Sequence, residues 1–311
     1  MKKKFLLSFL ISFICFSLIF IGLGEDFFLK KNTIAIDGNP VEDTDLVEGN
    51  KVEQKIKNEV LFLLVGVDAK DVKKSKGTRT DTMMLFKVNF DTGDIKLLSI
   101  PRDTRVLIKG KEDKINHAHA FGGIALTMKT VRDFLNLDVD YYVKVDYKVV
   151  EKVVDEIGGV EIDVPRDMKY KDPYSDPPLD INIKKGLKVL DGKNAHDFLR
   201  YRSGYKEGDL GRIKAQQMFM KEFIKQTLKL KNITKIPKFI NTYYEYVDTN
   251  IPLNVMLKGA ASAKKIDLEN MKTNTIPGTD KTIGGIDYLI YNREETEQIV
   301  QEMFGDYLLD Q

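Results

Sequence analysis

The chain has few of the side chains that enzymes most often use as nucleophiles or metal ligands. Its 311 residues include one cysteine, Cys15, and three histidines, His117, His119 and His196. No segment matches the G-x-S-x-G nucleophile elbow, the H-E-x-x-H zinc pair or the P-loop. His117 and His119 stand two residues apart, and we favour a structural role for them over metal binding. The sequence therefore excludes the most familiar hydrolase and metalloprotease motifs.

The chain also lacks an excess of charge of either sign. It contains 49 basic and 47 acidic residues, and three of the basic ones are Lys2, Lys3 and Lys4. Beyond residue 24 the net charge is therefore about −1. A protein that binds nucleic acid is expected to present a broad basic face. We expect no nucleic-acid partner, and any basic residues that matter must be clustered locally.

One long uncharged run is present, from Phe5 to Gly24, directly after the three lysines. Twenty helical residues span about 30 Å, roughly one hydrocarbon core. Lysines before the run place the amino end in the cytoplasm. We expect residues 1–24 to be a cytoplasmic tip and transmembrane anchor of a single-pass cell-membrane protein with an extracytoplasmic carboxyl-terminal domain. A cleaved signal peptide is the alternative.

Two further segments are expected beyond residue 24. Residues 25–56 are polar and weakly periodic, which predicts an extracytoplasmic stalk, and residues 57–311 form one domain. That domain opens with "VLFLLVGVD" (60–68), a run typical of a strand buried on both faces. A hairpin follows at 82–100, then a helix at 122–137, a strand at 140–146, a helix at 147–159 and a strand at 160–164. This alternation predicts an α/β fold.

The last third is expected to be mainly helical. We predict helices at 209–229, 234–246 and 252–265, two short strands ("NTIPG" and "IDYLIY"), and a final helix opened by Asn292 with Glu295 completing a capping box. The predicted architecture is a single αβα sandwich, with a mixed central sheet flanked by helices and one transmembrane helix before it.

Charged residues recur at the ends of the predicted strands. Asp68 ends the first strand, Arg79 and Asp81 begin the next, and Arg102 and Asp103 follow the hairpin. Ligands of open α/β sheets bind outside the strand ends, so these positions predict a site. Carboxylates bind hard cations and guanidiniums bind phosphate oxygens, so a Mg²⁺-bound diphosphate would satisfy both. The alternative is a ligand-free ion network between the aspartates and arginines.

A second cluster of charge lies in "FLRYRSGYKEGDLGRIKAQQ", residues 198–217. Arg200 and Arg202 are two apart, so they share one side only if the chain is not helical there. A helix begun near Asp191 must therefore stop before Arg202 if both bind one ligand. Asp209, Arg212 and Gln216 have the spacing of one helical stripe, with Asp209 as the cap. Helix amino ends favour anions, although a solvated face is the alternative.

Together, "GVD", "TRTDTMML", "LLSIPRDT", "KINHAHAFGG", "VDEIGGVEIDVP" and "LRYR…GDLGRIKAQQ" resemble the LytR-CpsA-Psr family, in this order. The resemblance covers about residues 60–230. It implies Mg²⁺, with Mn²⁺ as the alternative, and an apolar pocket for a lipid tail between sheet and helices. Matched residue by residue, it implies metal ligands Asp68 and Asp81, diphosphate-binding residues Arg79, Arg102, Arg200, Arg202, Arg212 and Gln216, and catalytic roles for Arg79, Arg102 and Asp209. Lys114 is a further match.

The function that this resemblance implies is a phosphotransferase. It would move a glycopolymer, such as teichoic acid or capsular polysaccharide, from a polyprenyl pyrophosphate carrier to a muramic acid hydroxyl of peptidoglycan. The metal and the arginines would stabilise the developing charge, with Asp103 and Asp209 as candidates for the general base. Two alternatives remain open: a hydrolase of the same lipid diphosphate, and a non-catalytic envelope regulator or transcriptional attenuator that binds it.

Overall fold

The computed structural model describes residues 58–67, 72, 75, 77–174, 179–227, 247–262 and 265–310. The expected anchor, the whole of the expected stalk and the expected helix at 234–246 lie outside these residues, as does Asp68. Among the described residues, no helix combines the length and hydrophobicity needed to cross a bilayer.

The centre of the structure is a mixed sheet of six strands. Their order is β11 (Val247–Thr249), β6 (Tyr141–Asp146), β1 (Glu59–Val67), β2 (Thr80–Asn89), β3 (Ile95–Ser99) and β12 (Lys272–Thr275). β1 runs parallel to β6 and antiparallel to β2, and β3 runs antiparallel to β2 and parallel to β12. The predicted hairpin is therefore confirmed as β2–β3.

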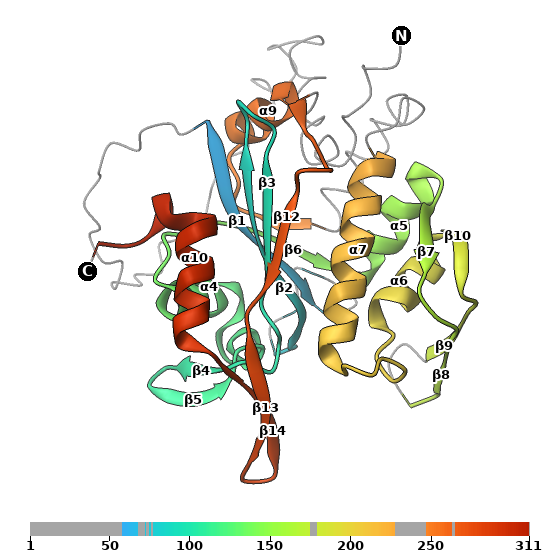
Figure 1. Ribbon diagram of the computed structural model, residues 1–311, viewed down its shortest axis with the longest axis horizontal. Coiled ribbons are helices and arrows are strands. Elements are labelled where there is room, and N and C mark those ends of the chain that lie inside the picture. The colour runs from blue at the N-terminus through green and yellow to red at the C-terminus, as the bar shows by residue number, and fades with distance from the viewer. Residues whose placement is uncertain are drawn as a thin grey trace, which may run out of the picture.

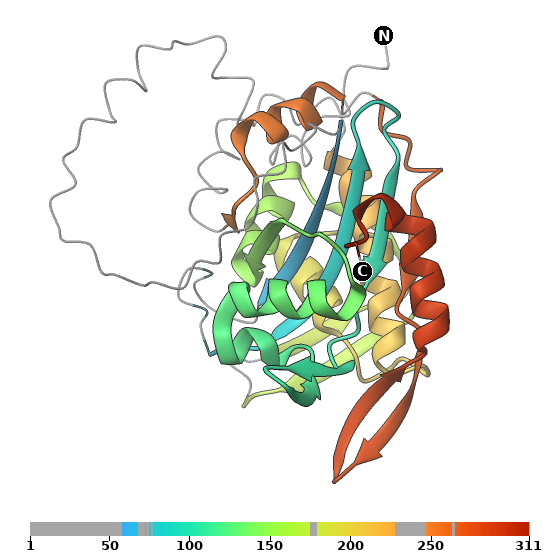
Figure 2. The same ribbon diagram turned by 90° about the vertical axis from the view of Figure 1, so that its left-hand side faces the viewer.

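Helices cover both faces of this sheet (Figures 1 and 2). One face carries α4 (His117–Leu135) and α10 (Arg293–Phe304), which is followed by the short helix η5 (Gly305–Tyr307). The other carries α5 (Tyr147–Ile157), α6 (Gly192–Arg200) and α7 (Asp209–Thr227), with α9 (Leu253–Ser262) near one end. The predicted mixed sheet flanked by helices is confirmed.

Four two-stranded pairings surround this core. They are β4 (Arg105–Ile108) with β5 (Lys111–Lys114), β7 (Val160–Val164) with β10 (Gly186–Leu190), β8 (Met168–Asp172) with β9 (Leu179–Ile183), and β13 (Gly278–Ile283) with β14 (Ile286–Tyr291). The strand predicted at 160–164 is therefore present, but it pairs with β10 and does not join the central sheet. The β13–β14 hairpin projects from the body of the molecule (Figure 2).

β1 is buried on both faces, as its continuous apolar run predicts. Leu61, Leu63 and Val65 pack in the cluster shared with α4 and α10. Val60 and Leu64 point the opposite way, into the cluster shared with α7 and α9. Because successive side chains of a strand point to opposite faces, a nine-residue strand in this position has few places for a polar side chain.

The helix ends follow from short-range hydrogen bonding. Asp146 and Asp191 cap α5 and α6 by accepting bonds from Val149 N–H and Asn194 N–H. Asn292 caps α10 by accepting from Glu295 N–H at 3.3 Å, as predicted. The capping box is modified, because the Glu295 carboxylate accepts from the Asn292 side-chain amide while Asn292 N–H donates to Pro277.

We predict that Asn292→Ala lowers the free energy of unfolding by about 1 kcal/mol, because it removes an N-cap acceptor. Urea denaturation monitored by circular dichroism measures this loss. Glu297→Ala is the matched control, since it removes only an exposed ion pair with Arg293 at 3.7 Å on the same helix. Equal destabilisation by the two substitutions would contradict the prediction.

Candidate functional site

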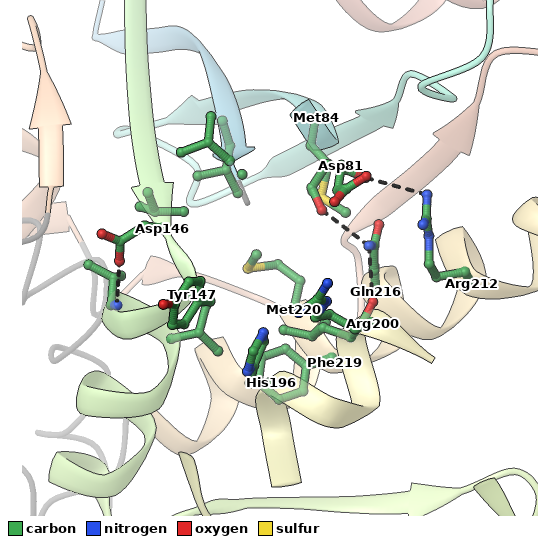
Figure 3. Close-up of a pocket in the computed structure, with 18 of the residues that line it drawn as sticks. Asp81, Met84, Asp146, Tyr147, His196, Arg200, Arg212, Gln216, Phe219 and Met220 are labelled. Carbon is green, nitrogen blue, oxygen red and sulfur yellow. Dashed lines mark hydrogen bonds between the residues drawn. The ribbon is translucent and has the colours of Figure 1, made fainter. Parts of the chain in front are cut away.

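A cavity of about 540 Å³ lies between the central sheet and the layer formed by α5, α6 and α7 (Figure 3). Most of its wall is apolar and comes from β1, β6, α5 and α7: Leu64, Val143, Val149, Phe219, Met220 and Phe223. We call it the tail cavity. A hollow whose wall is mostly apolar suits a hydrocarbon ligand.

Charged and polar side chains gather at one part of the tail cavity. The residues that line it there are Asp81, Arg102, Arg200, Arg202, Arg212 and Gln216. Arg200 is the last residue of α6, and Tyr201 leaves the helix with extended backbone angles. The prediction that this helix stops before Arg202 is confirmed, so both arginines reach the same cavity from a helix end and the loop after it.

Arg102 is held by aspartates from three segments. Its Nη1 donates to Asp81 Oδ1 at 2.5 Å, and its Nε lies 3.7 Å from Asp103 Oδ2 and 3.9 Å from Asp209 Oδ1. Asp103 in turn contacts Lys114 Nζ at 2.8 Å. The direct pair of Asp81 with Arg102 is one part of the ion network expected as the ligand-free alternative, and it fixes the guanidinium at the cavity.

α7 supplies the opposite wall of this charged region. Arg212 Nη2 lies 2.8 Å from Asp209 Oδ1 and 3.4 Å from the backbone oxygen of Asp81. One turn further on, Gln216 Nε2 donates to Thr82 Oγ1 at 3.1 Å and to Leu199 O at 3.4 Å. The predicted stripe of Asp209, Arg212 and Gln216 is therefore present, and it joins α7 to β2 (Figure 3).

The pKa values of two of the arginines are shifted in opposite directions. Burial alone would lower the pKa of Arg102, but the attraction of Asp81, Asp209 and Asp103 outweighs it and the pKa is raised. For Arg212, burial together with the repulsion of Arg102 and Arg202 outweighs the attraction of Asp209, and the pKa is lowered. An anion bound among these guanidiniums would offset both burial and repulsion.

A close approach of backbone to side chain shapes the start of α7. A Cβ at Gly211 would lie 2.4 Å from the Tyr205 Cβ, so only glycine permits this contact. Gly208 has a φ of 57°, in the left-handed region that glycine adopts without strain. These two glycines let the loop after Arg202 fold back onto α7, so that Arg212 lines the cavity with Asp209 paired to it.

Three predicted site residues are not among those that line the tail cavity. Asp209 contacts Arg102 and Arg212 at the charged region but does not itself line the cavity. Arg79 is exposed just before β2 and does not line the cavity. Asp68 lies outside the described residues, although Val67 before it pairs with Thr80, next to Asp81. Their assigned roles stay predictions.

Sequence reasoning missed a polar pair in the cavity wall. His196 lines the cavity, stacks on Tyr147 with ring centroids 5.0 Å apart, and contacts Glu151 Oε1 through Nδ1 at 3.0 Å. Its position four residues before Arg200 on α6 was the available signal. By contrast, His119 is fully buried and bonds to the Thr78 backbone oxygen, in line with the structural role favoured for it.

In the part of the chain that the structure describes, the charged region holds few carboxylates that could bind Mg²⁺. No group of three or more His, Cys, Asp or Glu side chains comes together within the described ranges. Of the two predicted metal ligands, Asp81 is the one within the described residues, and its side chain is 38% exposed. Mg²⁺ in phosphate sites is held by one or two carboxylates together with substrate oxygens and water, so a role for Asp81 as a metal ligand stays a prediction.

We predict that His196 makes stability depend on acid pH. Burial, reinforced by Arg200 and Lys193, lowers its pKa to about 4, against about 6.5 in the unfolded chain. The contribution of neutral His196 to the free energy of unfolding is complete above pH 6.5. It is lost as the pH falls from 6.5 through 4, because the unfolded chain takes up the proton first. Between pH 7 and pH 4, the free energy of unfolding of His196→Gln should therefore fall by about 1 to 3 kcal/mol less than that of the unmodified chain. Urea unfolding at both pH values measures this, and equal losses would contradict it.

Comparison with known proteins places this geometry in a family. The LytR_cpsA_psr family model matches residues 29–305. TagV of Bacillus subtilis, named a polyisoprenyl-teichoic acid–peptidoglycan teichoic acid transferase, is 33% identical over 300 residues, which cover 91% of this chain and 73% of TagV. TagU of Oceanobacillus iheyensis, which carries the same functional name, is 33% identical over 81% of this chain and 77% of its own length.

Solved structures agree. The crystal structure of B. subtilis TagV superposes with a TM-score of 0.68 at 31% identity and covers 81% of this chain and 98% of that one. A structure of TagT bound to LIIa-WTA superposes with a TM-score of 0.64 at 27% identity, over 81% and 92% of the two chains. From the sequence match, the sheet and the arginine-lined cavity together, this chain belongs to the LytR_cpsA_psr family.

Proposed function

We propose that the protein is a membrane-anchored phosphotransferase. It moves a cell-wall glycopolymer of the teichoic acid or capsular type from a polyprenyl diphosphate carrier to a muramic acid hydroxyl of peptidoglycan, and it releases polyprenyl phosphate. Residues 1–24 would hold it in the cell membrane, with the catalytic domain on the outer side.

One observation carries this proposal. The tail cavity combines an apolar interior with a charged region that contains Arg102, Arg200, Arg202 and Arg212. A lipid diphosphate has the same division, a hydrocarbon tail joined to a compact anion that guanidiniums bind in fork geometry. The names of the relatives as teichoic acid transferases support the same reading.

The reaction is a displacement at phosphorus. The acceptor oxygen forms a bond to the phosphorus next to the glycopolymer, the bridging P–O bond of the diphosphate breaks, and polyprenyl phosphate leaves with the bonding electrons. Arg102 and Arg212 face the region where the negative charge develops, and their pairing with Asp81 and Asp209 holds them in place beforehand. The hydroxyl proton passes to a base, for which Asp103 and Asp209 are the carboxylates beside Arg102.

Mg²⁺ would be held by Asp81 and, on the family's pattern, Asp68, with the remaining positions filled by diphosphate oxygens and water. When bound there, it would supply Lewis-acid stabilisation of the phosphoryl oxygens.

We predict that Arg102→Ala lowers the rate of glycopolymer transfer by about 10²- to 10³-fold, because it removes a donor aimed at the developing charge. The measurement follows radiolabelled glycopolymer from its polyprenyl diphosphate to peptidoglycan with the full-length protein in detergent. Arg105→Ala is the control, since Arg105 pairs with Glu112 and does not line the cavity.

Label released into solution in place of the wall would identify the protein as a hydrolase. Tight diphosphate binding without turnover over a range of acceptors would identify a sensor. Either result overturns the transferase proposal, and unchanged transfer by Arg102→Ala would overturn the site.

We further predict that transfer stops when a chelator removes divalent cations and returns on addition of Mg²⁺. Asp81→Asn should raise the Mg²⁺ concentration for half-maximal transfer about tenfold or more, because it removes one anionic ligand. Asp133→Asn is the control, since Asp133 pairs with Lys129 on the surface of α4. A chelator-resistant rate would contradict the metal assignment.

A further inference from the structure

A second hollow of about 60 Å³ lies beside the tail cavity, toward the other end of β1. Every side chain that lines it is apolar, and these include Val60, Phe86, Val88, Ile224 and Val255. We call it the distal hollow. It exceeds the roughly 10–15 Å³ that a single water needs, but it offers no polar side chain to hold one. A dry apolar hollow of this kind takes hydrocarbon.

The two hollows share one boundary. Leu64, Val143 and Met220 are the residues that line both of them. Leu64 on β1 and Val143 on β6 are register partners in the sheet, so they form a continuous floor. Met220 faces them from α7, where it packs against the clusters on both sides. The boundary is therefore two fixed sheet residues opposed by one helix residue.

Met220 is suited to a movable partition. It is only partly buried, whereas Leu64 and Val143 are 9% and 6% exposed. Figure 3 shows its side chain extending toward the middle of the tail cavity. A methionine has three rotatable bonds and no branch, so it changes rotamer at little cost. Rotation of this one side chain would join the two hollows.

The order of residues along β1 gives the pair of hollows a direction. Gly66 and Val67 line the tail cavity at the end of β1 that leads to the arginines, Leu64 lies at the boundary, and Phe62 and Val60 line the distal hollow. The six residue-to-residue steps of the strand from Gly66 to Val60 span about 20 Å. A tail that enters from the arginines reaches the distal hollow last.

We propose that the distal hollow binds the far isoprene units of the carrier's tail and that Met220 is the gate to it, so that this chain discriminates carriers by tail length. The inference rests on the proposed function, since it takes a polyprenyl diphosphate as the ligand. Short tails end in the tail cavity, and long tails displace Met220 and gain the additional apolar contact.

The test compares Kd for farnesyl diphosphate and undecaprenyl diphosphate, using the full-length protein in detergent. Val255→Trp fills the distal hollow from α9 and touches nothing in the tail cavity. It should weaken binding of undecaprenyl diphosphate by about tenfold or more, because the contact of at least one isoprene unit is lost, and leave farnesyl diphosphate within about twofold. Ile224→Phe fills the same hollow from α7 and should have the same selective effect.

Met218→Ala is the matched control, because Met218 lies on the same helix as Met220 and lines neither hollow. It should bind both ligands as the unmodified chain does. Farnesyl diphosphate binding also reports that each variant is folded. Equal loss for both tail lengths, or no loss for either in a variant that binds farnesyl diphosphate normally, would show that the distal hollow is only a packing gap. If the unmodified chain binds neither diphosphate, the proposed function fails and not the length discrimination alone.

Discussion

The structure of the site depends on bringing several guanidiniums together at the rim of an apolar cavity. Arg102, Arg200, Arg202 and Arg212 repel one another there, and Arg212 is also buried, which costs free energy unless counter-charges are fixed nearby. Asp81 and Asp209 supply them, one at the start of β2 and one at the start of α7. The start of β2 and the start of α7 are thereby held close together, and this positions the loop between α6 and α7.

The same arrangement leaves positive charge available. Arg212 is only 5% exposed, and its burial and its cationic neighbours lower its pKa. The attraction of Asp209 therefore does not fully offset burial and repulsion. Burial of Arg212 beside the apolar wall strengthens its charge interactions, because little water reaches it. Anion recognition and hydrocarbon recognition therefore support each other at this site.

Much of this could be predicted from local pattern. β1, the β2–β3 hairpin, α5 and the Asn292 cap follow from periodicity and capping residues, and motif resemblance identified Arg102, Arg200 and Arg212. Pairing between distant strands was harder, because β7 alternates like any sheet strand and nothing local indicates that its partner is β10. The His196–Glu151 pair was missed for the same reason, since its members lie 45 residues apart on two helices.

α7 carries both halves of the ligand site on one line. Arg212, Gln216, Met220 and Ile224 follow one another at intervals of four residues, from the anion rim to the distal hollow. This line is about 18 Å long, close to the length of β1 that faces it. Adding or deleting one residue within it would turn everything beyond that point by about 100° around the helix axis. The spacing of residues along the helix is therefore fixed. Substitution of single side chains is the means by which such a protein adapts to another carrier.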